Sequence, residues 1–563
     1  MSTIQQLLVD SFDIWTAADV TKKSGRGRSS NNLTSVYGIK KIRELILELA
    51  VRGKLVPQDP NDESASKLLK RIQAEKAKGI ASGEIKKGKL LALIKDDEKP
   101  FELPHGWEWT TLASICLINP RNNEKDNVFA SFVPMTMIDS TFNSLHGQEA
   151  RLWKEIKKGF THFSEGDIGI AKITPCFENS KACVFSGLTN RIGAGTTELH
   201  IIRPIKGTIV SRYVLAYVKS PPFLMVGKTK MTGTAGQKRL PKEFVESNPF
   251  PLPPLAEQHR IVAKIDELMA LCDQLEMQHK NAVGAHEKLV ANLLSMLVQS
   301  KKSESFLANW QRIAVHFDIL FTTEGSINAL KKTLLQLAMM GKLVPQDPND
   351  ESASKLLKRI QAEKAKGIAS GKMKKGKPLA LIKEDEKPFE LPHGWEWVRF
   401  GNIYSLEYGD NLPAEKRSNS GEYPVYGSNG IVGSHNVSFV HAPCIVVGRK
   451  GSAGALNLSF LTGCCVTDVA YYCIPEKNLD LFFSFKLFQT LGLDSLGKGI
   501  KPGLNRNEAY ELLIAIPPLA EQHRIVAKID ELMALCDQLK AGIHSADRLQ
   551  QILADTLVQK AVV

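Results

Sequence analysis

Two sets of glycine-rich loops carry the polar and basic side chains that could do chemistry in this sequence. Glycine lets a backbone approach a ligand closely, Lys and Arg neutralise phosphate charge, and Arg, Asn and Gln can pair with base edges through two hydrogen bonds. This combination is typical of contacts to nucleic acid, although a plain turn between strands explains any single loop as well. The candidate contact residues are Lys172, Thr174, Gln237, Lys238 and Arg239 in the first set, and Ser428, Asn429, Arg449, Lys450, Asn505 and Arg506 in the second.

Catalytic motifs are scarce in the same sequence. It contains no Gly-x-x-x-x-Gly-Lys-Ser/Thr phosphate loop, no His-Glu-x-x-His zinc motif and no Gly-x-Ser-x-Gly nucleophile elbow in a strand–turn–helix context. The glycines of 497–503 lack the strand and the acidic partner of a dinucleotide site. Residues 248–254, NPFPLPP, match only part of the Asn-Pro-Pro-aromatic motif of amino-methyltransferases. We therefore predict no catalytic residues and no cofactor in this chain.

Composition and charge describe an ordinary globular chain. Of its 563 residues, 43% are hydrophobic and 24% are charged, and the formal net charge is +13. The positive charge permits an acidic partner such as nucleic acid without identifying one. Nine cysteines without a Cys-x-x-Cys pair favour buried thiols over a metal site. Neither a long apolar run nor a signal peptide is recognised, so we predict a cytoplasmic location and no membrane partner.

Repeated blocks surround both sets of loops. The identical pairs are 53–83 with 341–371, 99–109 with 387–397, and 253–275 with 517–539. Between them lie two stretches of unrelated sequence, which we call the first insert (110–250) and the second insert (398–516). The repeated blocks around an insert are called its frame. Identical frames around different inserts indicate one task done twice and another task done in two versions.

A long helix is predicted after each insert. Mostly apolar residues recur at alternating spacings of four and three from Ile261 to Met296 and from Ile525 to Leu557, which is the pattern of a coiled coil. The polar exceptions are His279, His286 and Gln550. The predicted seam includes Ile261, Ile265, Leu268, Leu275, Ile525, Ile529, Leu532 and Leu539. About 40 residues would make each helix roughly 60 Å long. We expect the two helices to pack against each other in antiparallel orientation.

These patterns together predict an α+β fold, in which two α/β domains are joined by two long antiparallel coiled-coil helices with pseudo-twofold symmetry. Short β-like apolar runs alternate with glycine-rich loops in both inserts, which favours mixed domains there. The predicted segments are a helical first repeat (1–109), the first insert (110–250), the first long helix (251–300), the second repeat (301–397), the second insert (398–516) and the second long helix (517–563).

Motifs in the frames and in the inserts are similar to those of a known family. The frames contribute PLAEQHRIVAKIDELMALCDQL and LPHGWEW; the inserts contribute AKITPCFEN with GTTELHIIRP, and YPVYGSNGIVG with VVGRKGS. With these motifs the chain resembles the specificity (S) subunit of a type I restriction-modification enzyme over nearly its whole length. The long element KLVPQDPNDESASKLLKRIQAEKAKG is typical of a subfamily with long conserved regions.

The resemblance implies a DNA-reading subunit without catalysis of its own. The inserts would be target recognition domains that each read one half of an asymmetric bipartite site in double-stranded DNA, and the helices would set the spacer. The conserved regions would dock two modification (methyltransferase) subunits, and restriction subunits with ATP-dependent translocase and nuclease activity would join them. S-adenosylmethionine, ATP and Mg²⁺ would be bound by those partners, in the cytoplasm of a bacterium or archaeon.

Two other functions remain open from the sequence. NPFPLPP and the glycine loops would fit a methyltransferase fused to its own reader, which binding of S-adenosylmethionine by the purified chain would reveal. The heptads alone would fit a structural coiled-coil adaptor, which would lack the salt-dependent DNA affinity of a phosphate-binding protein.

Overall fold

Two compact units and two long helices make up the chain. The computed structural model describes residues 12–17, 36–85, 94–142, 146–234, 236–371, 378–496 and 503–562. The units are Met1–Asn281 with Ala546–Val563, and Ala282–Ser545. Helix α10 (Leu255–Gln299) begins in the first unit and ends in the second, whereas α18 (Leu519–Val562) begins in the second and ends in the first. The helices are therefore antiparallel, and the predicted α+β fold with two mixed domains is confirmed.

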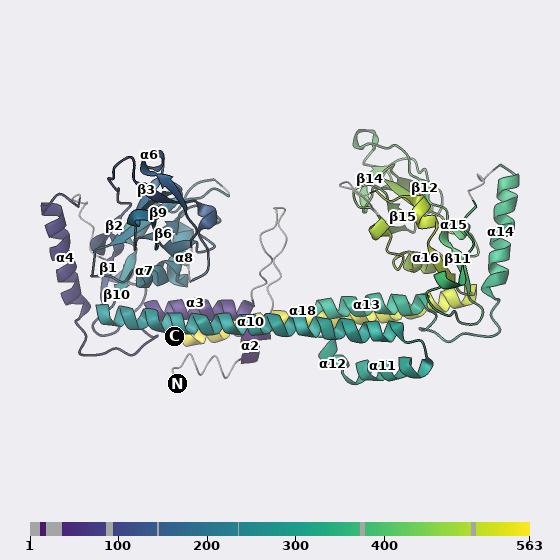
Figure 1. Ribbon diagram of the computed structural model, residues 1–563, viewed down its shortest axis with the longest axis horizontal. Helices are drawn as coiled ribbons and strands as arrows, with labels where there is room; N and C mark the ends of the chain where they lie inside the picture. Colours follow the sequence, from purple (N-terminus) through teal and green to yellow (C-terminus); the bar gives the residue numbers. More distant parts are fainter. Residues whose placement is uncertain are drawn as a thin grey trace. The chain divides into compact units, whose positions relative to one another are not determined.

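Helices form the frame of the first unit. They are α2 (Phe12–Ala17), α3 (Tyr37–Val51) and α4 (Ala65–Ala81), with the start of α10 and the end of α18 (Figure 1). Helix α3 shares one hydrophobic core with Ile261 and Ile265 of α10 and with Ala554 of α18. The Tyr37 hydroxyl donates to the Asp555 carboxylate at 2.9 Å. The end of α18 is thereby fixed to the frame of the first insert.

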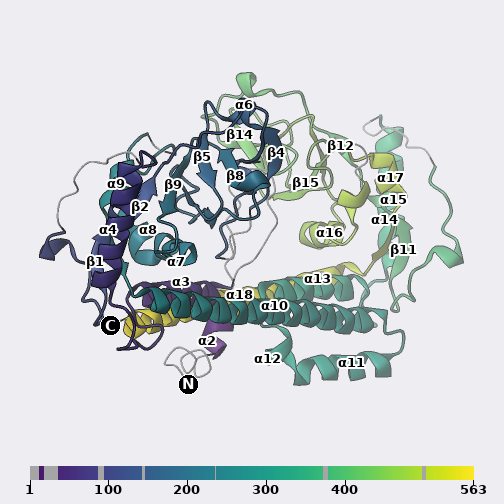
Figure 2. The same ribbon diagram turned by 60° about the vertical axis from the view of Figure 1, so that its left-hand side comes forward.

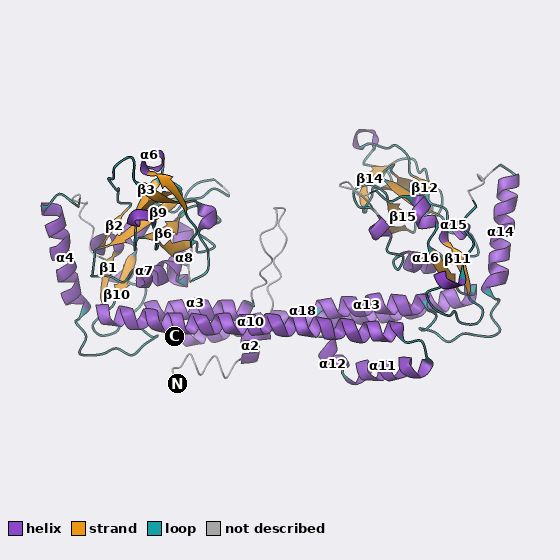
Figure 3. Cartoon of the chain, in the orientation of Figure 1, coloured by secondary structure: helices purple, strands orange, loops and turns teal. Residues whose placement is uncertain are grey.

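The first insert contains two four-stranded sheets, ordered β2-β9-β6-β7 and β4-β3-β8-β5 (Figure 3). Their strands are β2 (Cys116–Ile118), β3 (Phe129–Val133), β4 (Glu149–Leu152), β5 (Thr161–Ser164), β6 (Ile168–Ala171), β7 (Ala182–Val184), β8 (Ile192–Gly195) and β9 (Leu199–Pro204). The helices are α5 (Leu112–Ile115), α6 (Trp153–Ile156), α7 (Ser211–Lys219), α8 (Pro221–Lys230) and α9 (Lys242–Ser247). Helices α7 and α8 pack on α3, as the two views show for α7 (Figures 1 and 2).

The second unit has a frame built in the same way. Its helices are α11 (Ser303–Val315), α12 (Phe317–Leu320), α13 (Glu324–Met339) and α14 (Ala353–Ala369). Helix α13 packs with Leu294 and Leu297 of α10 and with Cys536 of α18 in one core. Lys331 of α13 forms an ion pair with Asp537 of α18. The end of α10 therefore lies in the frame of the second insert.

The second insert differs from the first in its sheets, which are ordered β12-β18-β15-β16 and β14-β13-β17. The strands are β12 (Glu407–Tyr408), β13 (Tyr423–Tyr426), β14 (Ile431–His435), β15 (Cys444–Gly448), β16 (Leu456–Ser459), β17 (Cys465–Val466) and β18 (Ala470–Cys473). The helices are α15 (Phe400–Ile403), α16 (Leu481–Phe488) and α17 (Arg506–Tyr510). Helix α16 packs on α13, the counterpart of the α7 contact with α3.

A two-stranded antiparallel ladder closes each insert where it joins its frame. Strand β1 (Glu108–Thr111) pairs with β10 (Pro249–Leu252), and β11 (Glu396–Arg399) pairs with β19 (Leu513–Ile516). Both second strands end just before a long helix begins. The two ends of an insert therefore leave the frame side by side, whatever the insert contains between them.

The buried face of the long helices agrees with the predicted seam near the start of each helix. The fully buried seam residues are Ile261, Ile265, Leu268, Ile525 and Ile529. Leu275 and Leu532 are partly buried against their cores, whereas Leu539 is 39% exposed. Leu539 is therefore on the solvent side of α18, outside the packed face.

Further along α10, the prediction of unbroken spacing is wrong. The buried residues there are Val290, Leu294 and Leu297, whereas Leu289 and Met296 of the predicted pattern are 51% and 45% exposed. A straight α-helix of 3.6 residues per turn drifts by about 20° per heptad away from a seam of period 3.5. In addition, this part of α10 packs on α13 as well as on α18, so its buried face is set by two neighbours.

A buried glutamate at the start of each long helix anchors the frame. The Trp107 indole donates to Glu257 at 3.0 Å, and the Gln58 amide donates to the same carboxylate at 3.2 Å. Glu257 is 1% exposed, and burial raises the pKa of its carboxyl more than these hydrogen bonds lower it. The same contacts occur in the second unit, where Trp395 and Gln346 donate to Glu521 at 3.0 and 3.2 Å.

Replacing Glu257 with Ala leaves the Trp107 indole buried without its acceptor, so we expect the first unit to lose about 1–3 kcal/mol of stability. Glu521→Ala should lower the stability of the second unit by a similar amount, because partners and distances repeat. The matched control is Glu267→Ala, at a side chain that is 51% exposed on α10, with an expected change below about 0.5 kcal/mol. Denaturant unfolding followed by tryptophan fluorescence measures these changes. A large loss for one glutamate and none for the other would contradict equivalent anchors.

Candidate nucleic-acid interface

Two loops of the first insert bring all five of its candidate residues together. Lys172 and Thr174 follow β6, and Gln237, Lys238 and Arg239 follow α8. The Thr174 amide donates to the Lys238 carbonyl at 3.0 Å, and the Lys238 amide donates to the Thr174 hydroxyl at 3.0 Å. The Leu240 amide donates to the Lys172 carbonyl at 2.8 Å. Thr174 therefore has a structural role in joining the loops, and the side chains of Gln237 and Lys238 are exposed.

Arg239 has a carboxylate partner that the sequence did not indicate. Its guanidinium donates to both oxygens of Glu198 at 2.9–3.2 Å, and Arg239 keeps 46% of its side-chain surface. The same contact holds the pKa of the Glu198 carboxyl below its usual value, because the hydrogen bonds and charge of Arg239 favour the carboxylate. Part of the positive charge predicted for this loop is therefore neutralised within the insert.

Three segments of the second insert converge in a similar way. The Leu504 amide donates to the Arg449 carbonyl at 2.9 Å, and Lys450 forms a β-bridge with Gly503. The hairpin turn with Ser428 and Asn429 lies against the same strand end: a Cβ added at Gly448 would be 2.4 Å from the Ser428 carbonyl oxygen. Residues 497–502 of the glycine-rich loop lie outside the described residues. The candidates of the second insert thus belong to one group of loops.

Tyr408 lies between two candidate arginines and was missed by the sequence reasoning. The guanidinium carbons of Arg449 and Arg506 lie 4.8 and 4.6 Å from the centre of its ring. Arg449 also donates to the Asp468 carbonyl at 2.9 Å, and Arg506 to the Leu406 carbonyl at 3.1 Å. Stacking on an aromatic face suits the planar guanidinium and restricts its motion. The one signal for Tyr408 in the sequence is its place before a glycine in a polar segment.

Asn505 has a structural partner of its own. Its side chain accepts a hydrogen bond from the Asn507 amide at 3.0 Å and caps the N-terminus of α17. Asn is among the preferred residues at this position, because its oxygen satisfies an amide that lacks a partner within the helix. The Asn505 side chain therefore holds Arg506 at the start of the helix.

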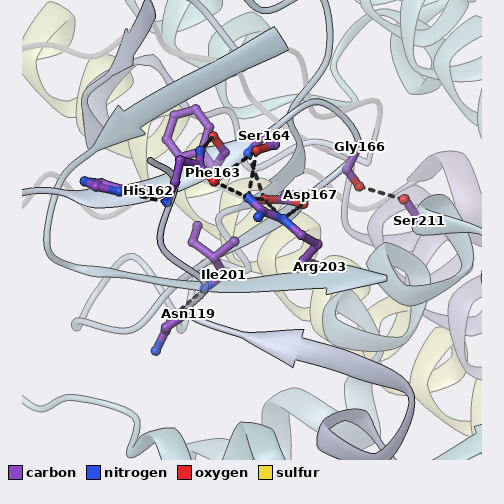
Figure 4. Close-up of polar contacts among 10 residues, drawn as sticks. Asn119, His162, Phe163, Ser164, Gly166, Asp167, Ile201, Arg203 and Ser211 are labelled. Atoms are coloured by element: carbon purple, nitrogen blue, oxygen red, sulfur yellow. Dashed lines mark hydrogen bonds and ion pairs between the residues drawn. The ribbon is translucent and has the colours of Figure 1, made fainter. Parts of the chain in front are cut away.

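An ion pair with a buried carboxylate connects several elements of the first insert (Figure 4). Arg203 donates to the Asp167 carboxylate at 2.7–3.0 Å and to the Ser164 hydroxyl at 2.8 Å. It also donates to the Asn122 side chain at 2.9 Å, and Asn122 donates to the Phe163 carbonyl at 2.7 Å. Burial raises the pKa of the Asp167 carboxyl in spite of Arg203. All the named partners belong to one insert, so this network fixes the segment before β3 onto β5.

Clusters of metal-ligating side chains and membrane-spanning helices are absent from the described parts of the chain. No group of three or more His, Cys, Asp and Glu side chains there could hold a metal ion. The nine cysteines are free thiols, and all except Cys176 are buried. None of the described helices has the length and apolarity needed to cross a membrane.

Comparison with known proteins gives a consistent result over both inserts. Residues 104–285 and 392–546 match the family model described as Type I restriction modification DNA specificity domain. The Type I restriction enzyme EcoAI specificity subunit of Escherichia coli is 47% identical over the whole length of both chains. The EcoEI specificity subunit of E. coli is 46% identical over 99% of this chain and 100% of its own. A solved structure from work on assembly of the type I R-M system covers 82% of this chain and 99% of its own, at 19% identity and a TM-score of 0.49.

Arg203→Ala removes the partner of a buried carboxylate, so we expect the first unit to lose about 3–5 kcal/mol of stability. The matched control is Lys242→Ala, which breaks the exposed pair with Glu246 and should cost at most about 1 kcal/mol. Chemical unfolding of the full chain measures both changes. Equal effects of the two substitutions would show that the Arg203 pair adds no more stability than an exposed ion pair.

Proposed function

Because the chain belongs to the type I restriction modification DNA specificity family, we propose that it reads a DNA target in two halves, one with each insert. It acts as the non-catalytic specificity subunit of a restriction-modification complex. One observation carries the two-part proposal: two frames that share identical sequence blocks hold two inserts with different sheets. Different inserts would recognise different half-sites, so the full target would be asymmetric. The long helices that join the units would set the spacer between the halves.

The way in which a frame holds its insert supports independent half-sites. The Gln258 side chain accepts from the Val210 amide at 2.9 Å, and Gln522 accepts from the Asp480 amide at 2.9 Å. Both amides immediately precede a helix of the insert, α7 or α16. A frame side chain that binds the backbone tolerates a change of the insert's side chains. The frame can therefore keep its sequence while the insert changes its specificity.

A second pair of frame residues makes the same kind of contact. Lys76 donates to the Ala113 carbonyl at 2.5 Å, and Lys364, at the equivalent position of the repeat, donates to the Asn402 carbonyl at 2.9 Å. Burial lowers the pKa of both ammonium groups. Lys76 thus fixes α4 to α5, and Lys364 fixes α14 to α15, through backbone oxygen and again without a requirement for one particular insert side chain.

The candidate loop residues would divide the work of DNA recognition. Lys172, Lys238 and Lys450 would neutralise phosphates, whereas Gln237, Ser428 and Asn429 offer hydrogen bonds for base edges. Arg449 and Arg506 would contact DNA in orientations set by Tyr408. Arg239 would contact phosphate only when its ion pair with Glu198 breaks, or when its guanidinium binds Glu198 and the phosphate together.

Partner subunits would dock on the frames. In the second unit α18 exposes Leu535 and Leu539, and in the first unit it exposes Leu549 and Leu553, with between 39% and 61% of each side chain accessible. Their spacing of four residues places each pair on one face of α18, which suits a helix of another protein. We assign these faces to two modification subunits. Restriction subunits, S-adenosylmethionine, ATP and Mg²⁺ would enter through those partners, and the cytoplasmic location remains a prediction.

Replacing residues 110–250 with the corresponding insert of another family member should change one half of the methylated target. The other half should stay the same, because the second insert and its frame are untouched. Sequencing of methylated DNA from cells that express the chimera with its partner subunits reads out both halves. The reciprocal control exchanges 398–516 and should change the opposite half. Alteration of both halves by one exchange would overturn the assignment of one half-site to each insert.

Glu198→Gln should strengthen DNA binding at low salt, because it releases the Arg239 guanidinium from its partner. One additional phosphate contact would make the slope of log affinity against log salt steeper by about 0.9. The matched control is Glu149→Gln, which breaks the exposed pair with Arg151 on β4 of the same insert. Fluorescence anisotropy with labelled duplex DNA over a salt series measures the slope. A slope that is equal in both variants would exclude Arg239 from the DNA interface.

A further inference from the structure

Two successive apolar residues of β14, Ile431 and Val432, are exposed in the second insert, by 63% and 45%. Side chains of a regular strand alternate between its two faces, so one of two neighbours would normally point toward the core. Here the ladder changes register: Tyr426 lies opposite Ile431, and the residue before Tyr426 lies opposite Gly433. Val432 is therefore the extra residue of a β-bulge. A bulge redirects the side chains beside it, which explains why both apolar groups reach solvent.

The bulge is braced by the segment before β13. The Arg417 guanidinium donates to the Val432 carbonyl at 3.0 Å. The Asn419 amide donates to the Ser434 carbonyl of the same strand at 3.1 Å. The Val432 side chain also covers the hairpin turn, since a Cβ added at Gly427 would lie 2.9 Å from it. The hairpin thus holds its two exposed apolar side chains on a backbone that is hydrogen-bonded on both sides.

The exposed pair adjoins the basic loops of the same insert. The turn that precedes Ile431 lies against the end of β15, where a Cβ added at Gly448 would be 2.4 Å from the Ser428 carbonyl oxygen. Arg449 and Lys450 follow directly after that strand. Figures 1 and 2 show β14 on the side of the insert away from α13 of its frame. Apolar groups beside basic groups suit a partner that is anionic outside and apolar within, as stacked bases between phosphates are.

The shape of the pair favours insertion between bases over contact with a thymine methyl group. One methyl group at a base edge is a small target, whereas two adjacent branched side chains offer more apolar surface than it can cover. Ile is among the side chains that enter between base steps and unstack them. A wedge must also withstand the stacked bases, which a braced hairpin does better than an unsupported loop.

We propose that Ile431 and Val432 form an apolar wedge that inserts between two base pairs of the half-site read by the second insert. The wedge rests on the proposed function, because it acts on the same DNA. Insertion unstacks and kinks one base step, and pyrimidine–purine steps deform most easily. The wedge therefore selects a deformable step without hydrogen bonds to its bases, while Arg449 and Lys450 contact the phosphates beside it.

The fluorescence of 2-aminopurine, which rises when this base analogue leaves the stack, tests the wedge. The full chain with its modification subunits is saturated with duplexes that carry its target. The probe occupies each position of the second half-site in turn, except the methylated base. We expect a rise at one step, which Ile431→Ala with Val432→Ala abolishes at saturation and Ile431→Met retains. The matched control is Val437→Ala, which removes a valine that is 60% exposed beyond the other end of β14 and should leave the signal unchanged.

Salt dependence separates the wedge from a phosphate contact. The double alanine variant should bind the target about tenfold more weakly with an unchanged slope of log affinity against log salt, because it removes no charge. Lys450→Ala should instead make the slope shallower by about 0.9. Anisotropy with labelled duplexes measures both effects. Thermal unfolding of the double variant should match that of the parent chain, because both side chains are exposed.

Unchanged fluorescence at every position of the half-site in the parent complex overturns the wedge. A loss of affinity that uracil in place of one thymine reproduces also overturns it and assigns the pair to a thymine methyl group. Normal DNA affinity of the double variant with weaker binding of modification subunits overturns it too and makes the pair a protein contact. Failure of the parent complex to bind or methylate a bipartite target would instead overturn the proposed function.

Discussion

The hydrogen bond from the Trp107 indole to the buried Glu257 carboxylate joins the chain that enters the first insert to the helix that leaves it. A carboxylate without water needs donors, and here they come from Trp107 and Gln58, both within the frame. The ladder between β1 and β10 runs beside this contact. Trp395, Gln346 and Glu521 repeat the arrangement. These hydrogen bonds join the two ends of the frame through frame residues alone. The sequence of the insert can therefore change while the hydrogen bonds are kept.

Several other contacts between frame and insert extend the same principle, whereas the ion pairs of Arg212 with Asp266 and of Lys486 with Asp530 do use a basic side chain of the insert. Gln258 and Gln522 bind backbone amides, and Lys76 and Lys364 bind backbone carbonyls. Backbone groups are present in any sequence with the right local conformation, whereas side-chain partners would tie a frame to one insert. A protein that must present different reading surfaces on a constant support therefore benefits from buried polar contacts that ignore the identity of the insert's side chains.

The two inserts position their basic groups by different physical means. In the first insert Glu198 accepts hydrogen bonds from Arg239 on both of its carboxylate oxygens and offsets part of its charge. In the second insert Tyr408 lies between Arg449 and Arg506 and leaves both charges in place. An ion pair orients a guanidinium but weakens the electrostatic attraction that it exerts on other groups. An aromatic ring also orients the guanidinium and leaves its positive charge unchanged. The two inserts therefore orient their candidate arginines differently, through a carboxylate in one case and an aromatic ring in the other.

The sequence by itself determined the repeated frames, the two unrelated inserts and the two long helices, because identity and apolar spacing are visible along the chain. It also indicated the loops with Lys172, Gln237 and Arg449, while its division of the chain into six segments remains a prediction. Only the tertiary structure paired Arg239 with Glu198, placed Tyr408 between two arginines and moved the buried face of α10 to Val290 and Leu294. Those outcomes depend on residues that are distant along the chain and on which neighbour packs against a helix, and neither is written in local spacing.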